Sequence, residues 1–166
     1  MADYGQQTLQ TVGNALQVIA SDFEKVNWKA GGITIDWAKV AAVSGSDVTL
    51  PNGTVIPIGQ KYIDMGTVLV KITSGGTTGY YGPADTTATD GRQTVDATRR
   101  GEVYINNEVI AQNPLGGALV QTASSDHPGV FDGGPVWRSR LHIGGTNEPT
   151  LANFLAAFPL ISFVSM

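Results

Sequence analysis

The stretch GTVLVKITSGGTTGYYGPADTTATDGRQT, residues 66–94, sets out a succession of local structures. Its first part, TVLVKIT (67–73), is rich in β-branched residues, which predicts a buried strand. The Thr- and Gly-rich tract that follows (73–89) has no lysine or arginine, and we expect it to form a long loop. Asp90-Gly91 then predicts a tight turn, because the aspartate side chain caps the backbone and glycine accepts a positive φ.

Segments on both sides of this stretch alternate with a period of two residues, which is typical of strands. Such patterns cover ITIDWAKV (33–40), EVYINNEVI (102–110) and GPVWRSRLHI (134–143). DVTLPNGTVIPI (47–58) predicts a hairpin, since Asn52-Gly53 supplies the positive φ of a tight turn. Five Gly-Gly pairs, which predict turns and loop ends, separate these runs: 31–32, 75–76, 116–117, 133–134 and 144–145.

The two ends of the chain have other patterns. LANFLAAF (151–158) predicts a short helix that begins after Pro149-Thr150 and ends at Pro159, and LISFV (160–164) predicts a last strand. Near the N-terminus, apolar residues recur with helical spacing at Leu9, Val12, Leu16, Ile19, Phe23 and Val26. That segment is interpreted as a core-facing amphipathic helix, as an arm that becomes ordered against a partner, or, from ALQVIA, as a strand.

These patterns together predict a mostly β protein with a small barrel-like or sandwich-like core, an N-terminal arm or helix and a short C-terminal helix. An α+β fold is the alternative. We expect residues 1–30 to form the arm or amphipathic segment and residues 31–166 to form one β-rich domain.

Composition narrows the classes of function. Of the 166 residues only 14% are charged, against about 25% in an ordinary soluble domain, which favours an assembly protein over a free enzyme. The net charge of −4 offers no basic surface for nucleic acid. There is no cysteine, and the N-terminus lacks the pattern of a signal peptide, which suits synthesis in the cytoplasm. The longest apolar run, 154–164, is too short to span a bilayer, so no membrane anchor is expected.

The sequence offers few candidates for a catalytic or metal-binding site. No phosphate-binding or nucleophile motif is present, and no cofactor, metal ion or catalytic residue is expected. Asp126-His127 with Asp132 is the one cluster worth testing as a metal or catalytic site, and its Pro/Gly setting favours a surface turn instead.

Asp85 and Asp90 have the residue types of a paired-acid hydrolase. The alternative is a turn in which the guanidinium of Arg92 pairs with a carboxylate, either of this chain or of a neighbouring subunit. Trp137 is a candidate for stacking on a sugar, although aromatic residues in strand patterns, such as Trp37 and Trp137, more often fill a core or an interface.

The opening stretch also resembles the central part of head decoration proteins of tailed bacteriophages, of the lambda-like type. The resemblance rests on a strand followed by a Gly-rich turn, a "G-x-Y-x-P-x-D" segment and "A-T-D-G", and it extends through RRGEVYINNEVI (99–110). It covers roughly residues 60–110. The residues that match are Gly66, Val68, Leu69, Ile72, Thr73, Gly79, Tyr81, Pro83, Asp85, Ala88, Thr89, Asp90 and Gly91.

The resemblance implies a structural protein, not an enzyme, that binds the outer surface of the expanded phage head. Its partners would be the major capsid protein and further copies of itself, as trimers at local three-fold axes. The implied capsid-binding arm contains Asp3, Tyr4, Gln6, Gln7 and Leu9, and the implied subunit-interface or turn residues are Tyr81, Asp85, Asp90, Gly91 and Arg92. The alternatives are a carbohydrate-binding module of a phage or cell surface, a hydrolase, and another virion protein of the tail or head-joining region.

Overall fold

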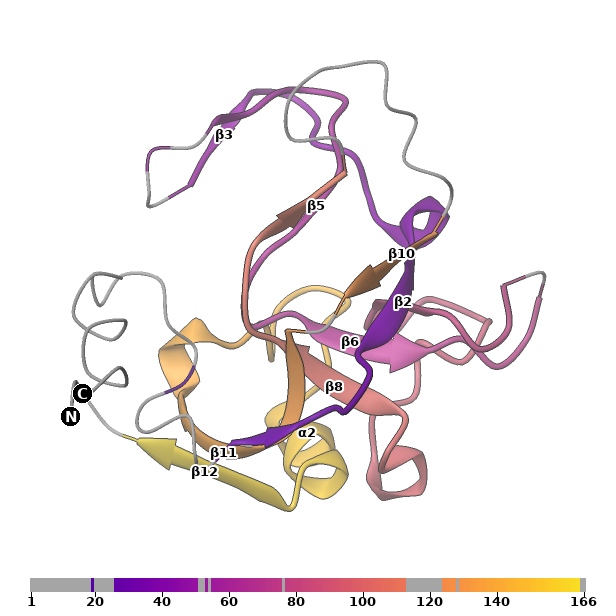
Figure 1. The fold of residues 1–166 in the computed structure, drawn as a ribbon, viewed down its shortest axis with the longest axis vertical. Helices are drawn as coiled ribbons and strands as arrows, with labels where there is room; N and C mark the ends of the chain where they lie inside the picture. The colour runs from indigo at the N-terminus through magenta and orange to yellow at the C-terminus, as the bar shows by residue number, and fades with distance from the viewer. Residues whose placement is uncertain are drawn as a thin grey trace, which may run out of the picture.

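A computed structural model of the chain describes residues 19, 26–50, 53, 55–75, 77–112, 124–127 and 129–164. Strands dominate these residues, and α2 (Leu151–Ala157) is the one α-helix among them (Figure 1). The predicted mostly β class is confirmed. No helix in the described ranges is long and apolar enough to cross a membrane.

The regular elements are short. The strands are β1 (Asn27–Trp28), β2 (Ile33–Asp36), β3 (Val48–Thr49), β4 (Val55–Ile56), β5 (Tyr62–Ile63), β6 (Val68–Lys71), β7 (Tyr81–Pro83), β8 (Val103–Asn106), β9 (Ile110–Ala111), β10 (Ser124–His127), β11 (Val130–Trp137) and β12 (Leu160–Val164). Among the described residues, three 3-10 helices lie between these strands: η3 (Trp37–Lys39), η4 (Ala97–Arg99) and η5 (Arg138–Arg140).

Eight strands form one mixed sheet in the order β1-β11-β8-β6-β7-β2-β10, with β12 beside β11. The β2–β7 and β11–β12 pairs are parallel, and the other pairs of this sheet are antiparallel. The predicted hairpin is present as the antiparallel β3–β4 pair, and β5 pairs with β9 in a second small sheet.

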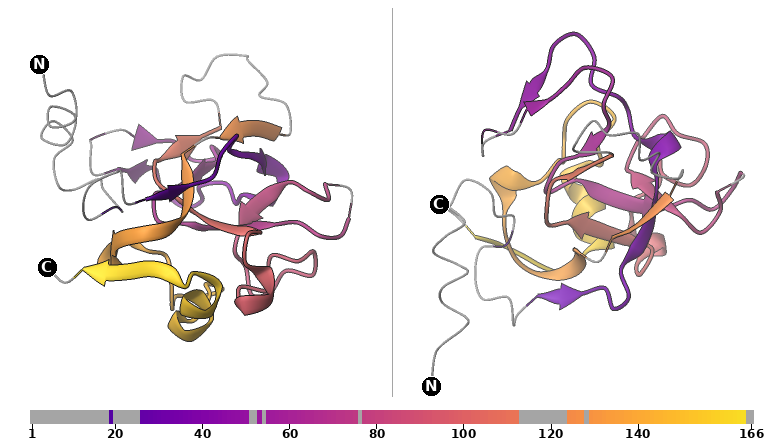
Figure 2. Two further views of the ribbon diagram at one scale, coloured as in Figure 1. Left: turned by 60° about the horizontal axis from the view of Figure 1, so that its bottom comes forward. Right: turned by 45° about the horizontal axis from the view of Figure 1, so that its top comes forward.

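Short connections join the two ends of the large sheet. Four residues separate β1 from β2, and two residues separate β10 from β11. The two segments face each other on both sides of these connections, because Trp28 lies opposite Phe131 and Ile33 lies opposite His127. The four strands therefore form one long antiparallel ribbon whose halves belong to opposite ends of the sheet. The ribbon has to bend, and the sheet curls round in a barrel-like way (Figures 1 and 2).

The curled sheet has a buried core on each face. Successive side chains of a strand point to opposite sides, so one strand can contribute to both cores. On β6, for example, Val68 and Val70 face one core and Leu69 faces the other. One core contains residues from all around the curl: Ile33, Ile35, Trp37, Val40, Ile63, Leu69, Tyr81, Tyr104 and Val130. The other lies beneath α2 and β12 and contains Ile19, Val26, Val68, Val70, Val95, Val103, Ile105, Phe131, Val136, Leu141, Phe154, Ala157 and Phe158.

The C-terminal predictions are confirmed. The Oγ1 atom of Thr150 accepts a hydrogen bond from the backbone N–H of Asn153 at 3.2 Å, which caps α2. The helix buries Phe154 and Ala157 and ends before Pro159. β12 then occupies the residues predicted for the last strand.

Several predicted boundaries are wrong. The strand predicted over 134–143 begins at Val130 and ends at Trp137, and 138–140 form η5, so Arg138 and Arg140 do not share a strand face with Val136. The pattern 33–40 is a strand only to Asp36 and then turns into η3. The pattern 102–110 is divided between β8 and β9, and the expected long loop 73–89 is interrupted by β7.

Gly133-Gly134 is not a turn but lies inside β11. A Cβ atom at Gly133 would lie 2.9 Å from the Cβ atom of Leu160 on the neighbouring strand, so the absence of a side chain serves close strand packing. The Pro/Gly setting of Asp126, His127 and Asp132 is likewise extended, since these residues belong to β10 and β11.

Most of the N-terminal segment lies outside the described residues, including the arm residues Asp3, Tyr4, Gln6, Gln7 and Leu9. Ile19 is 3% exposed and forms an antiparallel bridge with Val136, so the helix prediction is wrong at this residue and the strand alternative holds there. Val26 is buried in the same core, and β1 follows it. The β-rich body thus already includes part of the segment predicted as an arm.

Candidate functional site

The residues predicted for the interface or turn lie together, on β7 and the loop after it. Tyr81 is buried in the chain's own core, where its ring centroid lies 5.8 Å from that of Tyr104. Burial raises the pKa of Tyr81. Its position next to β2 and β6 makes it a core residue of this chain.

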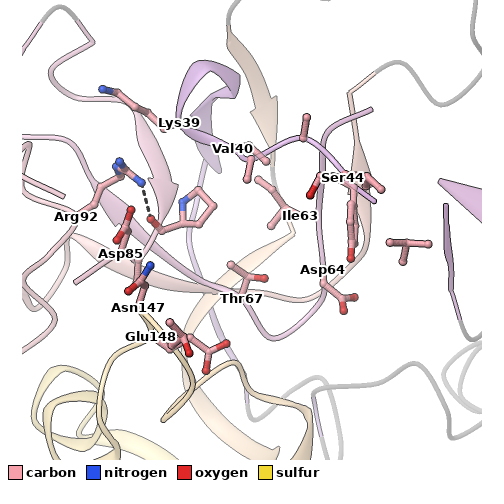
Figure 3. Close-up of a pocket in the computed structure, with 18 residues that line it drawn as sticks. Lys39, Val40, Ser44, Ile63, Asp64, Thr67, Asp85, Arg92, Asn147 and Glu148 are labelled. Carbon is pink, nitrogen blue, oxygen red and sulfur yellow. Dashed lines mark hydrogen bonds between the residues drawn. The ribbon is translucent and has the colours of Figure 1, made fainter. Parts of the chain in front are cut away.

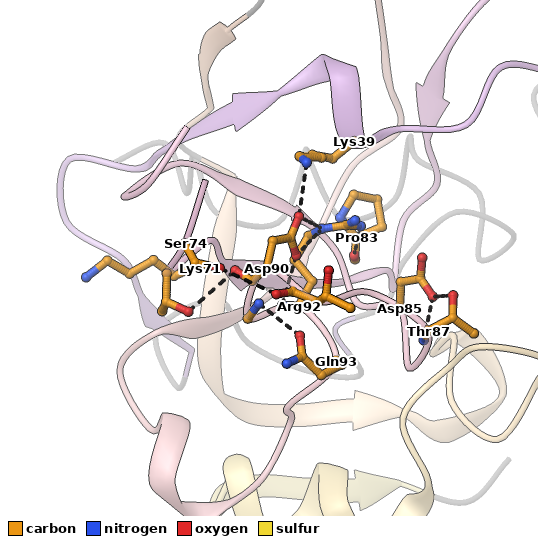
Figure 4. A network of polar contacts seen from close by, with 12 residues as sticks. Lys39, Lys71, Ser74, Pro83, Asp85, Thr87, Asp90, Arg92 and Gln93 are labelled. Atoms are coloured by element: carbon orange, nitrogen blue, oxygen red, sulfur yellow. Dashed lines mark hydrogen bonds and ion pairs between the residues drawn. The ribbon is translucent and has the colours of Figure 1, made fainter. Parts of the chain in front are cut away.

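Asp90 is the centre of a polar network that connects three segments (Figure 4). Its carboxylate accepts a hydrogen bond from Arg92 Nε at 3.1 Å and pairs with Lys39 Nζ at 3.1 Å. Arg92 also donates through Nη1 to the Pro83 carbonyl at 3.0 Å. Burial alone would raise the pKa of Asp90, but the hydrogen bonds from Lys39 and Arg92 lower that pKa below its ordinary value. The carboxylate that Arg92 holds therefore belongs to the same chain.

Gly91 forms the predicted turn with φ +105°. Its N–H donates to Gln93 Oε1 at 2.8 Å, and the carbonyl of Asp90 accepts from the backbone N–H of Thr73 at 2.8 Å. A Cβ atom at Gly91 would lie 2.3 Å from Thr73 Oγ1. The turn thus requires glycine for two reasons, its φ and its contact with the strand end after β6.

Asp85 caps a separate turn. One carboxylate oxygen accepts from the N–H and the hydroxyl of Thr87, at 2.9 and 2.6 Å. These hydrogen bonds lower the pKa of Asp85. A general acid of a hydrolase needs a raised pKa to hold its proton. The hydrogen bonds that lower the pKa values of Asp85 and Asp90 favour the charged form of both carboxylates, which does not suit a general acid.

A groove of about 450 Å³ runs past Asp85 (Figure 3). Arg92 and Asp85 lie at one end of it, and Ser44 and Asp64 lie at the other. It is lined by Lys39, Val40, Ala41, Ala42, Val43, Ser44, Val48, Tyr62, Ile63, Asp64, Thr67, Pro83, Ala84, Asp85, Arg92, Thr146, Asn147 and Glu148. Sequence reasoning missed this groove, because its lining comes from segments that are distant along the chain and share no local motif.

His142 connects two walls of the groove. Its Nε2 atom lies 3.5 Å from Asp64 Oδ2, and its Nδ1 atom lies 3.5 Å from Glu148 Oε1. The backbone N–H of His142 donates to the Gly66 carbonyl at 3.1 Å. The hydrogen bond to Asp64 and the charges of Asp64 and Glu148 raise the pKa of His142 above 6.5, although burial opposes this. Protonated His142 therefore joins the turn after β5 to the loop before α2.

We expect this contact to make stability depend on pH. Because the pKa of His142 is higher in the folded chain than its ordinary 6.5, its contribution is fully present below that value. The contribution is lost as pH rises through the raised pKa. Urea unfolding at about pH 5.5 and about pH 8.5 should show a larger decline in midpoint for the native chain than for His142→Gln.

His127→Gln, which replaces the chain's other histidine, is the control and should keep the native pH dependence. An equal decline in the midpoints of the native chain and His142→Gln would show that His142 does not bridge the two carboxylates in solution.

The other candidates do not converge on the groove. Asp126 and His127 lie on β10, whereas Asp132 lies on β11, where its carboxylate accepts a hydrogen bond from Asn27. In the described part of the chain no group of histidine and acidic residues is placed to hold a metal ion. Trp137 lies at the end of β11, half-buried and outside the groove lining.

Comparisons with protein-family models, with curated proteins and with solved structures return no match for this chain.

Proposed function

We propose that this chain is a structural decoration protein of a tailed-phage head. It binds the outer surface of the expanded shell, as trimers at local three-fold positions, and stabilises the shell against internal DNA pressure. Its partners are the major capsid protein and further copies of itself, and it uses no cofactor, nucleic acid or membrane. In the virion it lies on the outside of the capsid.

The observation that carries this proposal is the role of the residues that bear the resemblance. Gly91 and Asp90 build the turn that ties the loop to β6, and Asp85 caps the turn that follows β7. Pro83 lies opposite Leu69 in the β6–β7 pair and accepts a hydrogen bond from Arg92. Four of the matching residues, Pro83, Asp85, Asp90 and Gly91, thus shape β7 and the turns that follow it. A match of this kind supports a shared local fold more strongly than a match of composition would.

Surface properties also support an assembly role. Val55 and Ile58, on and after β4, are 50% and 56% exposed. These two exposed apolar side chains, three residues apart along the chain, are available for contact with a partner protein. The low proportion of charged residues agrees with a surface that is covered in the assembled particle.

The function can be tested on DNA-filled heads that lack decoration. Heads of the cognate phage would be heated with and without the purified chain, and DNA release would be followed with a dye. Bound decoration protein should raise the temperature of release. If the chain binds without changing that temperature, the stabilising role is wrong. If it does not bind, the decoration role is wrong and a tail or head-joining role is favoured instead.

The arm prediction has its own test. A variant lacking residues 2–10 should bind shells more weakly, because an extended arm adds main-chain hydrogen bonds to an open sheet edge. Its urea midpoint should match that of the full chain, since the core residues of the described structure begin at Ile19. Equal affinity of the two proteins for shells would count against a binding role for the arm.

A further inference from the structure

One edge of β12 is left unpaired by the strands that the structure describes. β12 pairs in parallel with residues 133–137 of β11, and no other strand of the described structure pairs with it. The backbone groups along such an edge can form hydrogen bonds with a further extended chain. The natural occupant of this edge is therefore a β-strand, not a helix or a small molecule.

The edge lacks the features that usually prevent strand pairing. Edge strands of soluble proteins are commonly protected by lysine, proline or a bulge. LISFV contains no charged residue and no proline, and its pairing with β11 is regular over all 5 residues. The chain as a whole is acidic, with net charge −4, so an uncharged edge is a place where two copies can meet without repulsion.

The side chains of β12 present this edge in a fixed orientation. Ile161 and Phe163 pack against the core beneath α2, and the Phe163 ring stacks on Phe154 with centroids 6.1 Å apart. Leu160 points away from that core and is 65% exposed, and Val164 lies on the same face beside Trp137. Leu155 of α2 is also 42% exposed. The edge is thus anchored on one face, and the other face, which carries Leu160, Ser162 and Val164, is uncharged.

We propose that β12 pairs antiparallel with β12 of a second copy, about a two-fold axis through Ser162. In this register Leu160 lies opposite Val164 of the partner copy, and Ile161 lies opposite its Phe163. Outward-facing residues then meet outward-facing residues, and core-facing residues meet core-facing residues. The contact is isologous, as a two-fold interface requires.

The register follows from the strand itself. Directly opposed residues of an antiparallel pair point to the same face, so a shift by one residue would place Leu160 opposite a core-facing residue. A shift by two residues would keep the faces but leave only three residues of each strand paired. The register centred on Ser162 is the one that uses all 5 residues and joins the two large sheets into one.

This contact goes beyond the proposed function and does not depend on it. A two-fold contact joins two copies in solution, whether or not a shell is present. On a shell it would join copies that belong to neighbouring three-fold positions.

Disulfide trapping tests the proposal, because the chain has no cysteine of its own. Opposed residues of an antiparallel pair have Cα atoms about 4.5–5.5 Å apart. That distance lies in the range of a disulfide. Ser162→Cys should therefore form a covalent dimer rapidly under mild oxidation. Leu160→Cys alone should not, because its two copies would be about 13 Å apart along the strands. A mixture of Leu160→Cys with Val164→Cys should give the heterodimer.

Ser46→Cys, in an exposed loop, measures the rate of chance collisions. If Ser162→Cys forms dimers no faster than Ser46→Cys, the proposed pairing is wrong. If Leu160→Cys alone forms dimers as fast as Ser162→Cys, the register is wrong.

A second measurement does not rely on oxidation. Ser162→Lys places two like charges at the two-fold axis. Because Ser162 is exposed, the lysine side chain can extend into solvent in the single chain. It should halve the molar mass measured by light scattering, with an unchanged circular dichroism spectrum. An unchanged mass would overturn the proposal.

Discussion

Replacing Gly66 with alanine is expected to lower the free energy of unfolding by about 3 kcal/mol or more. Gly66 has φ +79°, and a Cβ atom there would lie 1.8 Å from the carbonyl oxygen of Arg140. The obstacle is backbone, so no side chain can rotate away. The residue cannot shift easily, because its N–H donates to Asn106 at 2.7 Å and its carbonyl accepts from His142.

Gly59 provides a matched control. Its φ is +84°, but apart from its chain neighbours no atom of the described residues lies within 4 Å of the Cβ position. Gly59→Ala should therefore lose only the cost of a left-handed backbone, about 1–2 kcal/mol. Urea denaturation of the two variants separates the two effects. Equal losses would mean that the β5–β6 turn does not lie against Arg140 as the structure has it.

The second large effect is expected at Asp90. The side chains of Asp90 and Arg92 are only 13% and 10% exposed, and Asp90→Ala would leave the guanidinium without its carboxylate. Removing one partner of a largely buried pair costs about 3–5 kcal/mol. Lys39 would lose its partner as well. We therefore expect a loss near the lower end of that range, since Lys39 remains partly hydrated.

A double-mutant cycle measures this interaction directly. Asp90→Ala and Arg92→Ala should each destabilise the chain, and the double variant should lose clearly less than the sum of the two. Asp96→Ala, which removes the N-cap of η4, is the control and should lower the urea midpoint only by the small cost of losing a helix cap. Additive losses for Asp90 and Arg92 would show that the pair contributes nothing beyond each residue's own packing.

The Asp90–Arg92 pair also revises an expectation from the sequence. Arg92 was predicted to reach a carboxylate that a neighbouring subunit could supply, and the structure provides one two residues away. Arg92→Ala should accordingly lower the stability of the single chain, which unfolding at high dilution would detect. A role of these residues in a subunit interface stays a prediction.

Local signals account for much of the fold. The β-branched run of β6, the Asn-Gly hairpin and the break at Pro159 each act over a few residues, and the elements they predict are present. Gly133-Gly134 shows where local reasoning fails, because the glycines there serve the approach of Leu160 from a distant strand. The bent ribbon was not predictable either, since it depends on the register between residues 27–36 and 124–133.

The candidate site, like the fold, was predictable from the sequence only in part. The turn at Asp90-Gly91 was predictable from the two residue types, because their chemistry acts within the turn. The participation of Lys39 and the position of His142 between Asp64 and Glu148 were not, because nothing in the local sequence links these segments. The groove that they border exists only once the chain has folded.

The measurement that tests the central proposal most directly is co-sedimentation with expanded, undecorated shells of the cognate phage. The number of copies bound at saturation would be counted. The proposal predicts a plateau at three copies for each local three-fold position. Absence of binding to those shells would contradict it.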